Sequence, residues 1–216
     1  MTKNKSPNNQ ELLCIEAEKV YDWIIEESIF KTSINNVNFD FGTGVSCDQI
    51  ASVTCTITAL EITEVPDSRE DVQLIIDGEP ITLQKILLKK VITYSPTLTL
   101  ENGNTVTNAG FQFVAFEEVV LCAPEGTTIN ASETELNCIV TGYSFCQVID
   151  GGTELSLNFS VKFLICQSIT ATFPVILELK AGFCTPREPL AIDCPTPFVP
   201  AQCPSLFPVD RHTSSH

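Results

Sequence analysis

Ten cysteines are the residues of this chain with the clearest potential chemistry. They could form disulfides, bind a metal as thiolates, or pack as small apolar side chains. Structural zinc sites use cysteine pairs with about two to four residues between them. The closest cysteines here, Cys47 with Cys55 and Cys138 with Cys146, are much farther apart. We therefore expect disulfides or buried thiols and no bound metal.

The alternation of apolar and polar residues indicates where several sulfurs point, because successive side chains of a strand face opposite ways. Cys55 shares a face with Val53 and Ile57 and should point inward, as a core residue or in an internal bridge. Cys166 shares a face with Lys162 and should point outward. The pattern does not determine which cysteines pair. The outward and flanking cysteines are the candidates for disulfides between subunits: Cys14, Cys166, Cys184, Cys194 and Cys203.

Side chains suited to catalysis are scarce. The only histidines, His212 and His216, lie in the last five residues. Without a histidine placed among the strands, the common nucleophile and base pairs cannot form, and no phosphate-binding or nucleophile-elbow motif occurs. Glu117 and Glu118 are adjacent in a predicted strand, so their carboxylates should face opposite ways. We expect no enzyme and no cofactor. The remaining enzymatic alternative is a hydrolase whose carboxylates come from distant positions.

The charge balance excludes several classes of partner. The chain carries 27 acidic and 12 basic residues, a formal net charge of −15. Binding to nucleic acid or to an anionic membrane surface requires clustered Lys and Arg, so neither partner is expected. No apolar run reaches the length of about 18 residues that spans a bilayer. The first residues, MTKNKSPNNQ, are polar, so we expect no signal peptide.

A period of two residues dominates from about residue 50 to residue 180, as in strands with one buried face. In residues 154–166, six apolar side chains from Leu155 to Ile165 share one face, and residues 169–180 repeat the pattern. The remaining strands are expected at residues 53–59, 71–77, 81–94, 111–121 and 136–149, with turns at 65–67, 77–78, 102–103, 124–126 and 150–152. About seven short strands separated by turn residues predict an all-β fold, an antiparallel β-sandwich.

The two flanks differ from this central domain, predicted at residues 37–182. Residues 1–36 form a leader, in which residues 11–27 alternate and are predicted to be extended rather than helical. Residues 183–216 form a tail with seven of the 13 prolines, which favours extended, polyproline-like backbone. The leader could add a strand to a neighbouring subunit. Its candidate strand-donating side chains are Val20, Tyr21, Trp23 and Ile25.

Several stretches follow one another in a characteristic order. Residues 62–79 (ITEVPDSREDVQLIIDGE) pass a Val-Pro-Asp turn and reach a glycine, and residues 81–94 (ITLQKILLKKVITY) mix apolar and basic residues. Residues 111–126 (FQFVAFEEVVLCAPEG) end at a proline and a glycine, and residues 138–168 form a long hairpin. In this order the region resembles the SPOCS family of spore-coat-associated domains of endospore-forming bacteria. The segment CIEAEKVYDWI (residues 14–24) is similar to the leader that precedes such domains.

The resemblance implies a place and a role. Coat proteins of this kind are made in the mother-cell cytoplasm without a signal peptide and meet oxidants when that cell lyses, which would reconcile many cysteines with the polar N-terminus. The expected function is that of a structural subunit of the endospore surface (coat, exosporium or appendage fibre). It would assemble with copies of itself and with other spore-surface proteins, and disulfides would lock it. The sequence departs from the family where Arg69 is followed by Glu70 and Asp71, and the tail lies outside the family core.

The second functional interpretation is a lectin-like or adhesin binding module on the cell or spore surface. Such a module needs an exposed aromatic platform on which a sugar ring can stack. The aromatic side chains that could provide one are Tyr21, Trp23, Tyr94 and Tyr143.

Overall fold

The computed structural model describes residues 11–76 and 78–181. Cys14–Leu179 form one compact unit. Of a second unit, Met1–Leu13 with Lys180–His216, only residues 11–13 and 180–181 are described. The candidate cysteines Cys184, Cys194 and Cys203 lie outside the described residues. No helix in the described part of the chain is long and apolar enough to cross a bilayer.

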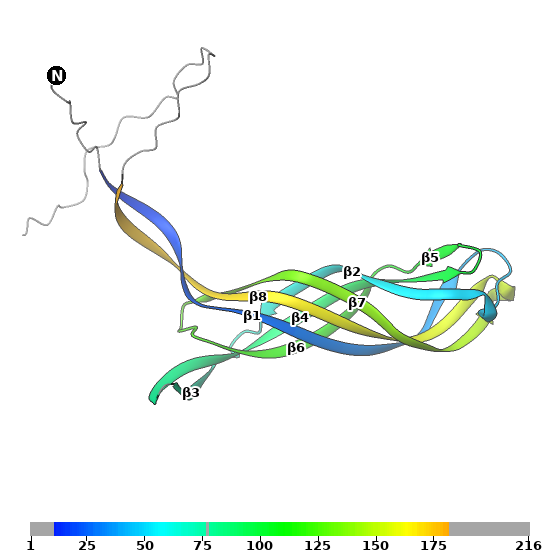
Figure 1. Ribbon diagram of the computed structural model, residues 1–216, viewed down its shortest axis with the longest axis horizontal. Helices are drawn as coiled ribbons and strands as arrows, with labels where there is room; N and C mark the ends of the chain where they lie inside the picture. The colour runs from blue at the N-terminus through cyan, green and yellow to red at the C-terminus, as the bar shows by residue number, and fades with distance from the viewer. Residues whose placement is uncertain (1–10, 77, 182–216) are drawn as a thin grey trace, which may run out of the picture. The chain divides into compact units, whose positions relative to one another are not determined.

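The first of two sheets has three strands in the order β1-β8-β7. They are β1 (Glu11–Asp40), β8 (Glu154–Ala181) and β7 (Thr128–Ile149). β7 pairs with β8 in antiparallel register from Ile149↔Glu154 to Thr128↔Thr172. β1 also runs opposite to β8 (Figure 1). We call this sheet A; β8 is its central strand and β1 and β7 are its edges.

The second sheet, sheet B, contains five strands: β2 (Ile50–Glu64), β3 (Glu70–Ile76), β4 (Glu79–Leu100), β5 (Thr105–Thr107) and β6 (Phe111–Leu121). β4 pairs with all the others. Gln84 and Lys85 of β4 pair with β3 and β6 at once, and residues 88–94 pair with β2 and β6. A strand has only two edges, so β2 and β3 follow one another along one edge of β4, and β6 lies along the other.

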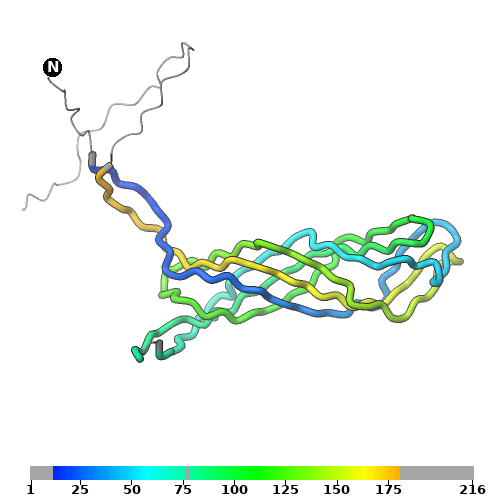
Figure 2. Tube along the Cα trace, viewed as in Figure 1, coloured from blue at the N-terminus to red at the C-terminus, as the bar shows by residue number. Residues whose placement is uncertain are grey.

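The predicted antiparallel β-sandwich is confirmed: the two sheets pack face to face around an aromatic cluster. The ring of Phe163 on β8 lies 4.9 Å from that of Tyr94 on β4 and 5.6 Å from that of Phe113 on β6. The predicted inward face from Leu155 to Ile165 is also confirmed, since these alternate residues are almost fully buried. The traces of the two sheets run along each other in Figure 2.

The β8 segment differs from the prediction in one respect. Residues 154–166 and 169–180 were expected as separate repeats, but they belong to a single strand of 28 residues. The alternation does not change between them, so Gln167 takes an inward position and is completely buried between Ile165 and Ile169. A polar residue at an inward position resembles a strand boundary in the sequence because it interrupts the apolar series.

The leader is extended as predicted, but it continues without a break into the sandwich. β1 crosses residue 36, and its Val37 and Phe39 are buried in the core. Asn36 has a positive φ of 57°, and the inward face changes there from even-numbered residues such as Ser28 to odd-numbered ones such as Val37. A residue in this conformation acts as a bulge that shifts the alternation by one. This part of β1 belongs to the compact unit Cys14–Leu179.

Tyr94 gives the fold a testable dependence on high pH. Its side chain is 2% exposed, and burial raises its pKa to about 12. The unfolded chain releases the phenolic proton near pH 10, so stability is intact below that pH and falls as the pH rises toward the folded pKa. Between about pH 9 and about pH 11, urea titrations should show the wild type losing about 1 kcal/mol more than Tyr94→Phe. Equal losses would contradict the burial of an ionisable phenol.

Candidate functional site

Four of the cysteines close one edge of the sandwich. Cys55 on β2 is bonded to Cys138 on β7, with Cα atoms 5.5 Å apart. Cys47, in the short helix η1 (Cys47–Gln49), is bonded to Cys146 on β7, with Cα atoms 6.0 Å apart. The first bridge joins sheet A to sheet B, and the second joins sheet A to the segment that leads into β2 of sheet B. Cys55 was expected to point inward, as a core residue or in an internal bridge, and the internal bridge is the alternative that the structure shows. Its partner could not be inferred from spacing.

Three cysteines of the described residues carry free thiols: Cys14, Cys122 and Cys166. Cys14 is exposed, and the other two are half-buried. Cys166 lies on the outward-facing side of β8, as its parity with Lys162 predicted. Sequence reasoning did not select Cys122, although it follows the inward-facing Leu121 on β6 and the same parity argument would have placed it outward.

The candidate strand-donating residues all lie on β1 within the same chain. Val20, Tyr21, Trp23 and Ile25 are exposed, with Trp23 at 58% and Ile25 at 67%. The indole Nε1 of Trp23 donates to Ser168 Oγ on β8 at 2.5 Å, so the ring lies over the outer face of sheet A. Lys19 lies over the Tyr21 ring at 4.4 Å. Tyr21, Trp23 and Ile25 therefore share the outer face of sheet A, whereas Val20 lies on the other side of β1 and is 55% exposed.

A buried polar layer crosses the sandwich, with one residue from each of four strands: Ser28, Lys90, Glu117 and Gln167. Lys90 Nζ donates to a carboxylate oxygen of Glu117 and to Ser28 Oγ at 2.8 Å. Ser28 donates to the other Glu117 oxygen at 2.5 Å, and Gln167 Nε2 donates to Glu117 at 2.9 Å. The layer separates two apolar clusters of the core. We call the half with the larger cluster and both disulfides the bridged half, and the other the thiol half.

Burial and pairing act against each other on the charges of this layer. The pKa of Lys90 is lowered because burial outweighs its hydrogen bond to Glu117. Burial alone would raise the pKa of Glu117, but the hydrogen bonds from Lys90 and Ser28 outweigh it and the pKa is lowered. The nearby Glu26 has a raised pKa, first through burial and then through repulsion by Glu117. A cation and a carboxylate held this way in the interior are coupled strongly.

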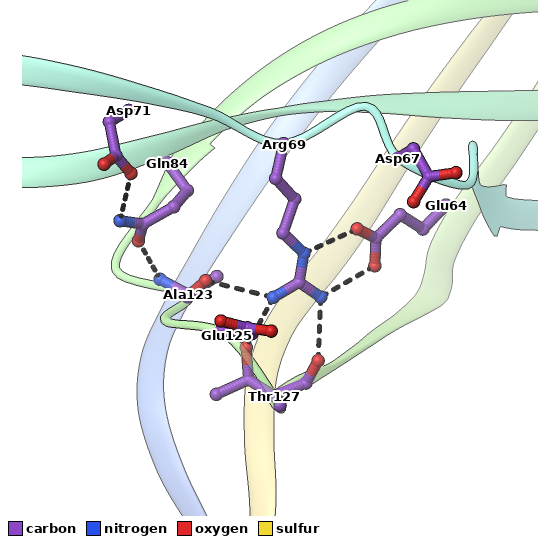
Figure 3. A pocket seen from close by; sticks show the side chains of 9 residues that line it. Glu64, Asp67, Arg69, Asp71, Gln84, Ala123, Glu125 and Thr127 are labelled. Carbon is purple, nitrogen blue, oxygen red and sulfur yellow. Dashed lines mark hydrogen bonds and ion pairs between the residues drawn. The ribbon is translucent and has the colours of Figure 1, made fainter.

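Arg69 is the centre of a second polar cluster, at the start of β3. Its guanidinium binds both carboxylate oxygens of Glu64, at 2.6 and 2.9 Å. It also donates to the carbonyl oxygens of Ala123 and Thr127 at 3.0 and 2.7 Å, and so holds the β6–β7 turn (Figure 3). The hydrogen bond to Glu64 raises the arginine pKa. All of its N–H groups point at protein atoms, so this arginine has no donor left for an anionic ligand.

The pocket around Arg69 has a volume of about 490 Å³ and an acidic rim. Asp67, Asp71 and Glu125 line it, and Asp71 accepts a hydrogen bond from Gln84 at 3.1 Å. No three acidic, cysteine or histidine side chains among the described residues are grouped in a way that could hold a metal ion. The cluster thus fastens β3 to the β6–β7 turn, and we assign it no chemical role.

A shallow groove lies on the outer face of sheet A, in the bridged half. It consists of two adjoining hollows of about 350 and 260 Å³ that share Thr141 and Ser160. The residues at its floor are small: Gly142 has no side chain, and the hydroxyls of Ser33 and Ser160 are hydrogen-bonded to each other at 2.8 Å. Lys31 lines one end and Tyr143 the other.

Comparison with known proteins identifies no relative. No protein-family model, no curated protein and no solved structure matches this chain.

Proposed function

We propose that this chain is a non-catalytic structural subunit of the bacterial endospore surface (coat, exosporium or appendage fibre), which assembles with itself and is locked by disulfides between subunits. The observation that carries the proposal is the distribution of its sulfurs. Four cysteines are bonded in the bridged half, whereas Cys166 lies at the level of the polar layer and Cys14 and Cys122 lie beyond it. The free thiols of the described residues thus lie away from the bonds that hold the fold.

Exposed apolar side chains support the same proposal. β1 and the end of β8 expose large apolar residues in the thiol half, among them Trp23, Ile25, Ile176 and Leu177. Large apolar side chains exposed on two neighbouring strands favour an interaction surface. The resemblance to SPOCS domains suggests the spore surface as the place, with synthesis in the mother-cell cytoplasm.

The locking step is an oxidation of two thiols on neighbouring subunits. With glutathione disulfide as oxidant, the two cysteines lose two electrons and two protons and join, and two glutathione thiols are released. Protein oxidised in this way should form a ladder of covalent oligomers in non-reducing electrophoresis that collapses to one band on reduction. The triple variant Cys14→Ser, Cys122→Ser, Cys166→Ser should shorten or abolish the ladder.

A matched control is Thr170→Ser, which alters an outward position of β8 without removing a thiol and should leave the ladder unchanged. Mass spectrometry of the cross-linked peptides identifies the bonded cysteines and includes Cys184, Cys194 and Cys203. A monomer in which every sulfur is bonded within its own chain would refute the proposal.

A sugar-binding module is the second candidate, favoured by the groove at Tyr143. That ring is 51% exposed beside the hydroxyls of Thr141, Ser144 and Ser160, a combination that can stack on and hydrogen-bond to a sugar. Tyr94 cannot belong to such a platform because it is buried. Glycan-array binding that Tyr143→Ala abolishes would support this candidate over the structural one.

A further inference from the structure

Beyond Thr128, where β7 begins, the described part of sheet A continues as two strands. The last residue of β8 with a β7 partner is Thr172, so residues 173–179 have β1 as their only ladder neighbour among the described residues. We call residues 14–20 of β1 and 173–179 of β8 the ribbon. Its apolar side chains are exposed: Ile176 at 78%, and Leu177 and Leu179 at 43% each. A two-stranded ribbon is marginally stable in water by itself, so this one needs a cover.

The two sides of the β1 strand of the ribbon differ in charge: Glu16 and Glu18 lie on one side and Lys19 on the other. Glu16 and Glu18 lie on the same side of β1, since they are two residues apart, and both are exposed. Glu178 adds a third exposed carboxylate on β8. None of the three forms an ion pair with another described residue. A surface that covers the side with Glu16 and Glu18 should therefore supply positive charge.

The groove over Ser160 has positive charge of this kind. Ser33 on β1 and Ser160 on β8 are joined by their hydroxyls across the antiparallel pair. Lys31 is two residues before Ser33 and Lys162 two residues after Ser160, so the two lysines lie on the same face as cross-strand neighbours. Neither lysine has an acidic partner within the described part of the chain. The floor formed by Gly142 and the two serines lets an extended backbone approach closely.

We propose that the groove of one copy binds the ribbon of a second copy, with Lys31 and Lys162 facing Glu16 and Glu18. This inference rests on the proposed function and gives its subunits a polarity. The ribbon lies in the thiol half and the groove in the bridged half, so the contact joins unlike surfaces. Contacts of this type do not close into a two-fold dimer and, unless the rotation closes a ring, they propagate as a filament.

Charge reversal tests the pairing, measured by sedimentation velocity in reductant so that only non-covalent contacts count. Lys31→Glu with Lys162→Glu should weaken association at least about tenfold, and Glu16→Lys with Glu18→Lys should do the same. The chain with all four changes should recover association. Lys89→Glu, at an exposed lysine of sheet B, is the control and should change nothing; unaltered urea midpoints establish that the variants fold.

Mixing the two double variants tests whether the groove and the ribbon act between copies. The groove variant keeps a ribbon that fits the unchanged groove of the ribbon variant, and its reversed groove matches the reversed ribbon of that variant. An equimolar mixture should therefore associate, although neither variant does so alone. Undiminished self-association of either double variant, a mixture that does not associate, or a four-fold variant that stays dissociated would overturn the inference and leave the disulfide-locked subunit standing. A wild type that stays monomeric in both oxidant and reductant would refute the proposed function as well.

Discussion

Replacing Lys90 with methionine is expected to lower the free energy of unfolding by about 3–5 kcal/mol, because it leaves a buried carboxylate without its cation. Lys90 is completely buried, and the side chain of Glu117 is 15% exposed. Methionine fills a similar volume and removes only the ammonium group. Glu117 must then become protonated or draw water into the core. Urea titration at neutral pH measures the loss, which should shrink at acidic pH as the carboxyl takes up a proton.

The double variant Lys90→Met, Glu117→Leu separates pairing from packing. Removing both charges avoids an unpaired ion, so the double variant should be more stable than Lys90→Met alone and close to the wild type. The exposed neighbour Lys89→Met is the control and should change stability by less than about 0.5 kcal/mol. A double variant that is no more stable than Lys90→Met would mean that the two charges are not coupled.

Loss of both disulfides should cost more than twice as much as loss of either one. With one bridge in place, the other closes a small loop, because Cys55 is eight positions after Cys47 and Cys146 is eight positions after Cys138. Such a loop is worth about 3 kcal/mol, whereas the last remaining bridge closes a loop of about 80–100 residues, worth about 4–5 kcal/mol. Removing the second bridge therefore lowers the free energy of unfolding more than removing the first.

Three variants measure this difference: Cys55→Ala with Cys138→Ala, Cys47→Ala with Cys146→Ala, and the four changes together. The other thiols are first blocked with iodoacetamide, so that no new bridge can form. Urea midpoints should fall modestly for each pair and steeply for the four-fold variant. A four-fold loss smaller than the sum of the two single-pair losses would contradict the nested-loop explanation.

Period-two alternation predicted the sandwich well where strands have one apolar and one polar face. The β6 bounds agree with the prediction, and the inward face from Leu155 to Ile165 is correct. The alternation gave the wrong inward face or the wrong strand bounds where both faces of a strand are apolar or where an inward residue is polar. On β1, the apparent apolar face with Trp23 is the outer one, and Ile24 packs inward. At Asn36 a bulge changes the parity, and nothing in the residue type alone requires that conformation.

The candidate site was predictable in part, for a physical reason. Parity shows the side of a strand on which a sulfur lies, which was enough for Cys55 and Cys166. Pairing depends on which strands are neighbours across the two sheets, and that is a property of topology. The groove was not predictable for the same reason, since Lys31 and Lys162 are 131 residues apart in the sequence and meet only because β1 lies beside β8.

The bond between Cys47 and Cys146 also sets how far the subunit can lengthen under tension. A pull applied to the neighbouring ends of β1 and β8 would unzip these two strands one rung at a time, since they run in opposite directions. The unzipping stops at the covalent bond, and the chain between the two sulfurs, which includes all of sheet B, bears no load. Only the outer segments can then extend, by at most about 3.4 Å per residue, so the bond acts as a built-in limit on stretching.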